Sequence, residues 1–225
     1  MILEVATFNL KDAFAAAQVG ADRLEVCTNY KMGGLSPPAE WIFALRQTIS
    51  IPVISIVRPR GGDFFYSVDE ISEMRNQGHS LKTAGSESLV FGCLNKDHSL
   101  DIKTCHDLIL DWRSPTVLHR AFDECNDPFK AVDHAIEAGF HRILTAKGAK
   151  NMDLLKNLRN YANDRIEILP GGGIRSSNID QYINSSFQTI HSSAITGKKN
   201  KMDPGEIALL KLKLLNFKTT MNSHQ

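Results

Sequence analysis

The chain lacks any long apolar run. No stretch approaches the roughly 20 apolar residues that a membrane-spanning helix requires. Residues 1–14 carry Glu4 inside their only apolar run and have no basic segment before it, unlike a signal or transit peptide. We therefore expect a cytoplasmic protein without a membrane partner.

An excess of charge of either sign is also missing. The 225 residues include 26 Lys and Arg and 25 Asp and Glu, which gives a formal net charge of +1. Nucleic-acid binding depends largely on many basic side chains that neutralise phosphates, so this balance argues against a nucleic-acid partner. The length and the hydrophobic content of 42% fit one folded domain, which we expect to span residues 1–225.

Cysteine is scarce and widely spaced. Cys27, Cys93, Cys105 and Cys125 include no CxxC pair, which argues against a zinc site and against a disulfide framework. Isolated cysteines are more often small buried hydrophobic residues than metal ligands. A reducing compartment fits this pattern best.

What the sequence does contain is a repeated unit, in which an apolar-periodic helix ends in Gly or Ala and a short β-branched or Leu-rich strand follows. Two examples are QVGADRLEVC at 18–27 and EAGFHRILTA at 137–146. The predicted strands lie near 2–6, 23–27, 53–57, 88–91, 116–119, 142–145, 167–170 and 189–192. The clearest predicted helices span 11–19, 39–48, 129–138, 152–161 and 204–217.

Eight such units predict a single-domain α/β protein with the (β/α)8 TIM-barrel fold. The alternative, an open doubly wound sheet, usually has a glycine-rich turn directly after its first strand. Here that turn reads TFNLKDA and contains no glycine. The glycines cluster instead at 171–173, after the seventh strand, where barrels commonly hold a phosphate.

Acidic side chains fall inside the first two predicted strands. Because strand side chains alternate between faces, Glu4 and Glu25 lie opposite apolar neighbours and are expected to face the barrel lumen. A buried carboxylate needs a partner, and later strand ends supply candidates. These candidates are Arg58, Arg60, His119, Arg120 and Asp123. They predict one pocket that contains an acid, a base and an arginine clamp for an anion. Glu4, Glu25 and His119 are the predicted acid–base residues. The alternative is that these side chains form a purely structural layer of ion pairs.

Two loop regions favour anion binding. In VRPRGGDFFYS, Arg58 and Arg60 flank Pro59, and Asp63 follows a glycine pair; Arg60 and Asp63 alternatively brace the loop. Gly171, Gly172 and Gly173 precede an Arg-Ser-Ser-Asn segment able to cap a helix. His191, Ser192 and Ser193 end the eighth strand. Together they predict a phosphate or other oxyanion site, although His191 is equally well interpreted as a core histidine.

Several segments, in order, resemble the copper homeostasis protein CutC family. They are GADRLEVC, GGLSP, IPVISIVRPRGGDFFYS, HRAFDECNDP, RILTA, PGGGI and HSSA. The resemblance runs from Ile2 to about Ala194 and implies a cytoplasmic TIM barrel linked to copper tolerance and copper binding. It places Cys27 at a cysteine proposed as a copper ligand. It also implies that the family's shared pocket motifs include Glu4, Glu25, Arg58, Arg60, Asp63, His119, Arg120, Asp123 and His191. Many relatives have a second cysteine where this chain has Ala6.

Two functional hypotheses follow. The first is a copper-handling protein that binds Cu(I) through Cys27 and a second soft ligand, which a homo-oligomer would supply from another subunit. The second is an enzyme that acts on a small phosphorylated or carboxylated metabolite by acid–base chemistry. No organic cofactor is evident in the sequence. A purely structural polar lumen is the third interpretation.

Overall fold

The computed structural model describes residues 1–147, 151–185, 187–197 and 201–222, and the side chains only as far as 217 within the last helix. Eight strands pair in parallel, in the order β7-β6-β5-β4-β3-β2-β1-β8, and β7 contacts β8 to bring the sheet round into a nearly closed barrel. The strands are β1 (Ile2–Thr7), β2 (Arg23–Val26), β3 (Val53–Ile56), β4 (Ser88–Phe91), β5 (Thr116–Leu118), β6 (Arg142–Thr145), β7 (Glu167–Pro170) and β8 (Thr189–Ser192). The predicted TIM barrel is confirmed.

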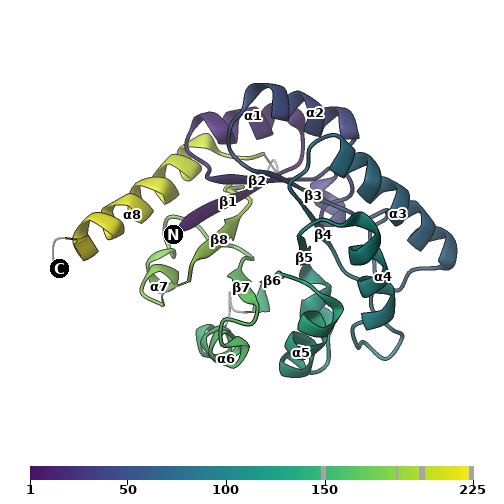
Figure 1. Cartoon of the computed structure of the whole chain (residues 1–225). Helices are drawn as coiled ribbons and strands as arrows, with labels where there is room; N and C mark the ends of the chain where they lie inside the picture. The colour runs from purple at the N-terminus through teal and green to yellow at the C-terminus, as the bar shows by residue number, and fades with distance from the viewer. Residues whose placement is uncertain (148–150, 186, 198–200, 223–225) are drawn as a thin grey trace.

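Helices follow the strands and lie around the outside of the strand array (Figure 1). They are α1 (Leu10–Gln18), α2 (Ala39–Thr48), α3 (Val68–Thr83), α4 (Ile102–Trp112), α5 (Pro128–Ala138), α6 (Met152–Ala162), α7 (Asp180–Ile183) and α8 (Pro204–Asn222). The 3-10 helices η1 (Tyr30–Met32) and η2 (Arg120–Glu124) lie in the loops after β2 and β5. Within the described residues, no helix combines the length and apolarity that crossing a membrane would need.

Local chemistry explains where the helices begin and end. Ser67 and Glu70 form a reciprocal capping box at the start of α3, and the Asp127 side chain accepts from two backbone N–H groups where Pro128 starts α5. Gly139 ends α5 with a φ of 97°, a left-handed conformation that glycine adopts without steric cost. These caps satisfy the unpaired donors and acceptors that every helix end exposes.

The buried apolar residues form two separate clusters. The larger lies between the sheet and the helices and includes Leu3, Val5, Leu24 and Val26. The smaller fills the barrel lumen and consists of Cys27, Ile54, Ile56, Val90, Val117, Leu144 and Leu169. Alternate residues of each strand therefore face the helices or the lumen.

Candidate functional site

Glu4 and Glu25 lie on the lumen side of the barrel. Glu25 pairs in register with Ile54, a member of the lumen cluster, and with Ala6 of β1. Glu4 shares the lumen face with Ala6, two residues further along β1, and pairs in register with His191 of β8. Strand alternation and parallel register together bring residues from both ends of the chain into one buried cluster.

The Glu4 carboxylate is fully buried and has three cationic or ionisable partners. Its Oε2 accepts from Arg23 Nε at 2.5 Å and Arg142 Nη1 at 3.4 Å, and its Oε1 lies 2.8 Å from His191 Nδ1. Burial by itself raises the pKa of Glu4, but the hydrogen bond and charge of His191, together with both arginines, outweigh it and bring the pKa to about 2. Glu4 is therefore an anion at neutral pH.

His191 is oriented by that anion. Because Glu4 only accepts hydrogen bonds, the Nδ1 atom of His191 must be the donor, which leaves Nε2 free to act as an acceptor in the neutral ring. Burial lowers the pKa of His191, but the charge of Glu25 and the contacts with Glu4 outweigh it and raise the pKa above its ordinary value. A carboxylate that fixes a histidine tautomer in this way is typical of the surroundings of metal-ligating histidines.

Glu25 has a much poorer set of partners. Its Oε1 accepts from the Cys27 thiol at 3.3 Å, whereas its buried Oε2 has no hydrogen-bond partner among the described residues and lies 3.8 Å from His191 Nδ1. Burial raises the pKa of Glu25, and burial together with Glu25 raises the pKa of the Cys27 thiol well above its ordinary value. Donor atoms of Glu4, Glu25 and His191 all lie within 4.8 Å of one another.

Arg58 and His119 form a second buried group, just after the ends of β3 and β5. The guanidinium of Arg58 donates to the carbonyl oxygens of Met32, Gly34 and Gly62, and so joins the loops after β2 and β3. The Phe64 ring contacts both side chains: its centroid lies 4.7 Å from the Arg58 guanidinium and 4.6 Å from the centroid of the His119 ring.

His119 is held in its neutral form. Burial, followed by the charge of Arg58, lowers the pKa of His119 to about 3. Its Nδ1 accepts from the Ala121 backbone at 3.3 Å. The buried His119 Nε2 and Arg58 Nε atoms have no hydrogen-bond partner in the described part of the chain.

Two other predicted pairs connect loops at the protein surface. Arg60 bonds Asp63, the Phe65 carbonyl and Glu70, which braces its loop against α3. Asp123 accepts from Arg120 and also binds the end of β6, through Thr145 Oγ1 at 2.6 Å and the Ala146 N–H at 3.0 Å.

The loops after β7 and β8 are joined by side chains that the sequence did not identify. Arg175 donates to the carbonyl oxygens of Ile174 and Ile195 and to the hydroxyls of Ser192 and Ser193. The carboxylate of Glu206, in the first turn of α8, accepts from the Ser176 N–H at 2.5 Å and its hydroxyl at 2.9 Å. A carboxylate of the protein itself thus accepts a hydrogen bond from a backbone N–H in the region where an oxyanion was predicted to bind.

The glycines after β7 let the chain pass close to its neighbours. A Cβ on Gly171 would lie 2.8 Å from Leu144 Cδ1 and 3.4 Å from His191 Cδ2. A Cβ on Gly172 would lie 2.4 Å from the Ala146 Cβ, and Gly172 and Gly173 both have positive φ. Gly171 therefore has a packing role beside His191, apart from any role in ligand binding.

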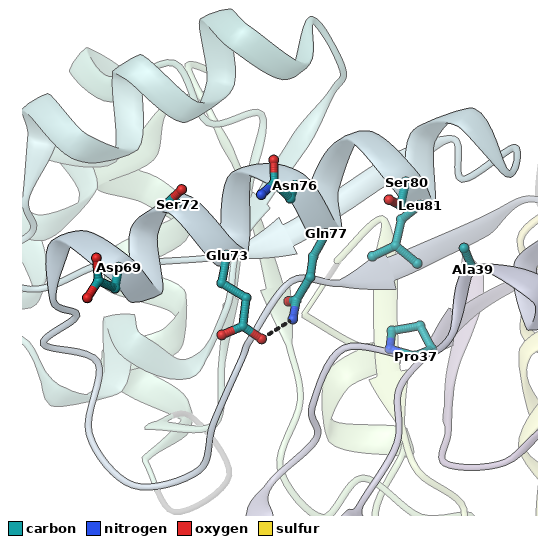
Figure 2. Close-up of a pocket in the computed structure, with 9 residues that line it drawn as sticks. All are labelled: Pro37, Ala39, Asp69, Ser72, Glu73, Asn76, Gln77, Ser80 and Leu81. Atoms are coloured by element: carbon teal, nitrogen blue, oxygen red, sulfur yellow. Dashed lines mark hydrogen bonds between the residues drawn. The ribbon is translucent and has the colours of Figure 1, made fainter.

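A surface groove of about 640 Å³ lies outside the barrel, between α3 and the start of α2 (Figure 2). Gln77 within it donates to Glu73 at 2.7 Å and accepts from Ser36 Oγ at 2.5 Å, and that hydroxyl in turn accepts from the Arg58 N–H at 2.8 Å. The residues that line the groove, all in the described part of the chain, include none of the predicted site residues. The groove is therefore a feature separate from the lumen cluster.

Arg23 and Arg142 are the lumen residues that sequence reasoning missed. Both lie at the first position of a strand, two residues before a side chain that faces the lumen. The alternation of strand side chains would therefore have predicted that they face the lumen as well. Their pairing with Glu4 depends on the way the barrel closes.

Comparison with known proteins agrees with this architecture. The family model described as the CutC family matches residues 1–196. The human copper homeostasis protein cutC homolog is 35% identical over 207 residues, which cover 89% of this chain and 76% of the relative. A family protein CutC from Enterobacter sp. strain 638 is 37% identical over 198 residues, covering 86% of this chain and 80% of the relative. The crystal structure of CutC from Streptococcus agalactiae superposes with a TM-score of 0.81 at 30% identity, covering 87% of this chain and all of that one. The chain belongs to the CutC family.

Proposed function

We propose that this protein handles copper and binds Cu(I) in the barrel lumen through Cys27, His191 and Glu25. The names of the relatives support a copper role, and in the lumen the Glu25 carboxylate lies 3.3 Å from the Cys27 thiol and 3.8 Å from His191 Nδ1. Thiolate and imidazole ligands suit Cu(I). In this proposal the second ligand comes from His191 of the same chain and not from another subunit.

The observation that carries the proposal is the imbalance between the two lumen glutamates. Glu4 contacts two arginines and His191 directly, whereas Glu25 has the Cys27 thiol and only a long, 3.8 Å contact between its buried Oε2 and His191. A buried carboxylate oxygen without a hydrogen-bond partner is costly, so a bound cation would fit beside Glu25. Glu4 remains outside the ligand set and orients His191.

Competition with a chromogenic Cu(I) chelator under anaerobic conditions tests the proposal. The protein is expected to retain a Cu(I) equivalent that Cys27→Ser protein loses to the chelator, and that His191→Gln protein holds at least tenfold more weakly. Glu87→Gln, at an exposed ion pair with Arg46, serves as the control and leaves the affinity unchanged. Equal affinity of Cys27→Ser and the unaltered protein refutes the assignment.

A second candidate function is favoured by the unpartnered atoms of Arg58 and His119. Buried polar atoms without partners mark places where a ligand or a water completes the hydrogen bonding. Arg58 would bind a small phosphorylated or carboxylated metabolite, and His119, Glu25 and Glu4 would serve acid–base chemistry.

Thermal shift assays with inorganic phosphate and with pyruvate test this candidate. At least one anion should raise the melting temperature of the unaltered protein more than that of Arg58→Lys protein, which keeps the charge but loses the planar fork. Equal shifts in both proteins count against it.

A cytoplasmic location is part of the proposal. Cys27, Cys93, Cys105 and Cys125 are all free and buried, which suits a compartment that keeps thiols reduced. A homo-oligomer stays a prediction, and the lumen site does not depend on it.

A further inference from the structure

Three cysteines that the lumen site does not use gather on the opposite side of the sheet. Cys93 follows β4, Cys105 lies on α4 and Cys125 follows η2, and all three belong to the larger apolar cluster between sheet and helices. We propose that Cys93 and Cys105 form a second, two-coordinate Cu(I) site, which the ion reaches past Cys125. The proposal rests on the copper function only for the identity of the ion.

The fold holds Cys93 and Cys105 together. Leu94 and Leu100 form a bridge that closes the segment between β4 and α4, and the Asp101 N–H donates to the Cys93 carbonyl at 2.9 Å. Asp101 also caps α4, one turn before Cys105. As a result, the Cys105 thiol donates to the Cys93 carbonyl oxygen at 3.8 Å, and the neighbouring Cys105 thiol together with burial raises the pKa of Cys93 well above its ordinary value.

The pair is shielded from solvent. Cys105 is fully buried and Cys93 is 2% exposed, in a region where the side chains around them are mainly apolar. A site of this kind discriminates by ligand softness, because a hard hydrated cation would find few oxygen ligands to replace its water. Two thiols offer Cu(I) a pair of soft ligands, whereas the lumen site combines one thiol with an imidazole and a carboxylate.

Cys125 connects the pair to the surface. It interacts electrostatically with Cys105, and its own thiol contacts the Ala121 carbonyl at 3.7 Å. It also lines a hollow of about 320 Å³ whose other residues include Asp97, His98, Asp127 and His134. The hollow therefore brings two imidazoles, two carboxylates and one thiol together, a set that ranges from harder to softer ligands.

The binding step involves no change of oxidation state. Each thiol loses its proton to solvent, each sulfur forms one bond to Cu(I), and the ion leaves the chelator or carrier that delivered it. One Cu(I) ion and two thiolates together give the site a net charge of −1. A Cys93–Cys105 disulfide would be the competing state of the same pair and would bind no copper.

Anaerobic Cu(I) titration with chelator competition and ultraviolet thiolate-to-copper absorption tests the inference. The unaltered protein should retain two equivalents. Cys93→Ala/Cys105→Ala protein should lose one of them with most of the ultraviolet band, while Cys27→Ser protein keeps that one. Cys125→Ala should leave the stoichiometry unchanged and slow copper uptake at least tenfold.

Each outcome separates the two copper proposals. Retention of both equivalents by the Cys93→Ala/Cys105→Ala protein overturns the second site, whereas retention of both by Cys27→Ser overturns the lumen site. Should the double variant fail to fold, as judged by circular dichroism, Cys105→Ser alone replaces it with the same expected loss. A Cys93–Cys105 disulfide found by mass spectrometry in freshly purified protein, with no copper taken up by this pair after reduction, also contradicts the inference.

Discussion

At the scale of single residues, two glutamates a few ångströms apart differ because of their partners. Glu4 and Glu25 are both buried in the same lumen, yet the pKa of Glu4 falls to about 2 and that of Glu25 rises. Glu4 has Arg23, Arg142 and His191 around it, and their combined charge more than offsets the cost of burial. Glu4 is thus a permanent anion, whereas the neighbouring Glu25 readily accepts a proton or a cation.

The fixed anion should be essential for stability. Glu4→Gln keeps the shape of the side chain but removes the direct counter-charge of the largely buried Arg23 and Arg142, and we expect a loss of about 3 kcal/mol of unfolding free energy at pH 7. Urea denaturation measures it. Glu87→Gln, at the exposed Arg46 pair, is the control and should change stability by no more than about 0.5 kcal/mol. A loss below about 1 kcal/mol in Glu4→Gln would mean that the ion network is dispensable.

At the scale of elements, the loop after β7 is shaped by contact with β6 and α8. Gly172 and Gly173 both have positive φ, but only Gly172 approaches a neighbouring residue, Ala146. The two glycines therefore separate the effect of backbone strain from that of steric contact.

Gly172→Ala should destabilise the protein more than Gly173→Ala. The second substitution incurs only the left-handed strain, about 1 kcal/mol, because its Cβ meets no atom within 4 Å. The first adds a clash at 2.4 Å with Ala146 and should lose a further 1–3 kcal/mol, roughly the cost of overpacking a core. Thermal unfolding of both variants provides the comparison, and equal losses would show that the loop moves aside freely.

The link between this loop and α8 supports a similar comparison. Glu206 is 7% exposed and accepts two hydrogen bonds from Ser176, so Glu206→Gln should lose about 2 kcal/mol. Asp180→Asn breaks an exposed ion pair with Lys213 between α7 and the same helix and should have almost no effect. Chemical denaturation of the two variants would contradict the account if the order were reversed.

The sequence predicted elements better than it predicted contacts. Each of the eight strands was placed within about one residue at either end, because helix ends marked by glycine and short β-branched runs are local signals. The Glu4–Arg142 pair spans 138 positions, and Glu206 returns from α8 to a loop 30 positions earlier. Such pairs depend on register and closure, which local patterns do not contain.

At the scale of the whole molecule, buried titratable groups link stability to pH. His119 has a folded-state pKa near 3, below its ordinary 6.5. Below pH 6.5 the unfolded chain therefore binds a proton that the folded chain rejects, so stability decreases as pH falls from 6.5 towards 3. Glu4 adds a loss of the same sign only below about pH 4.5.

Replacing His119 isolates its contribution. His119→Asn keeps an acceptor near the Ala121 N–H and removes the titration. Between pH 7 and pH 5 the unaltered protein should lose about 2 kcal/mol more stability than this variant, as followed by urea denaturation. Parallel pH profiles for the two proteins would show that His119 is not held neutral by burial.

The central claim is that Cu(I) binds in the lumen of this barrel. X-ray absorption spectroscopy at the copper edge tests it most directly, on Cys93→Ala/Cys105→Ala protein loaded with one equivalent of Cu(I) so that the second thiol site is absent. The account predicts retained copper whose nearest neighbours are one sulfur together with nitrogen or oxygen, and loss of the sulfur signal in the triple variant that adds Cys27→Ser. Copper lost on desalting, or a spectrum unchanged by Cys27→Ser, would contradict it.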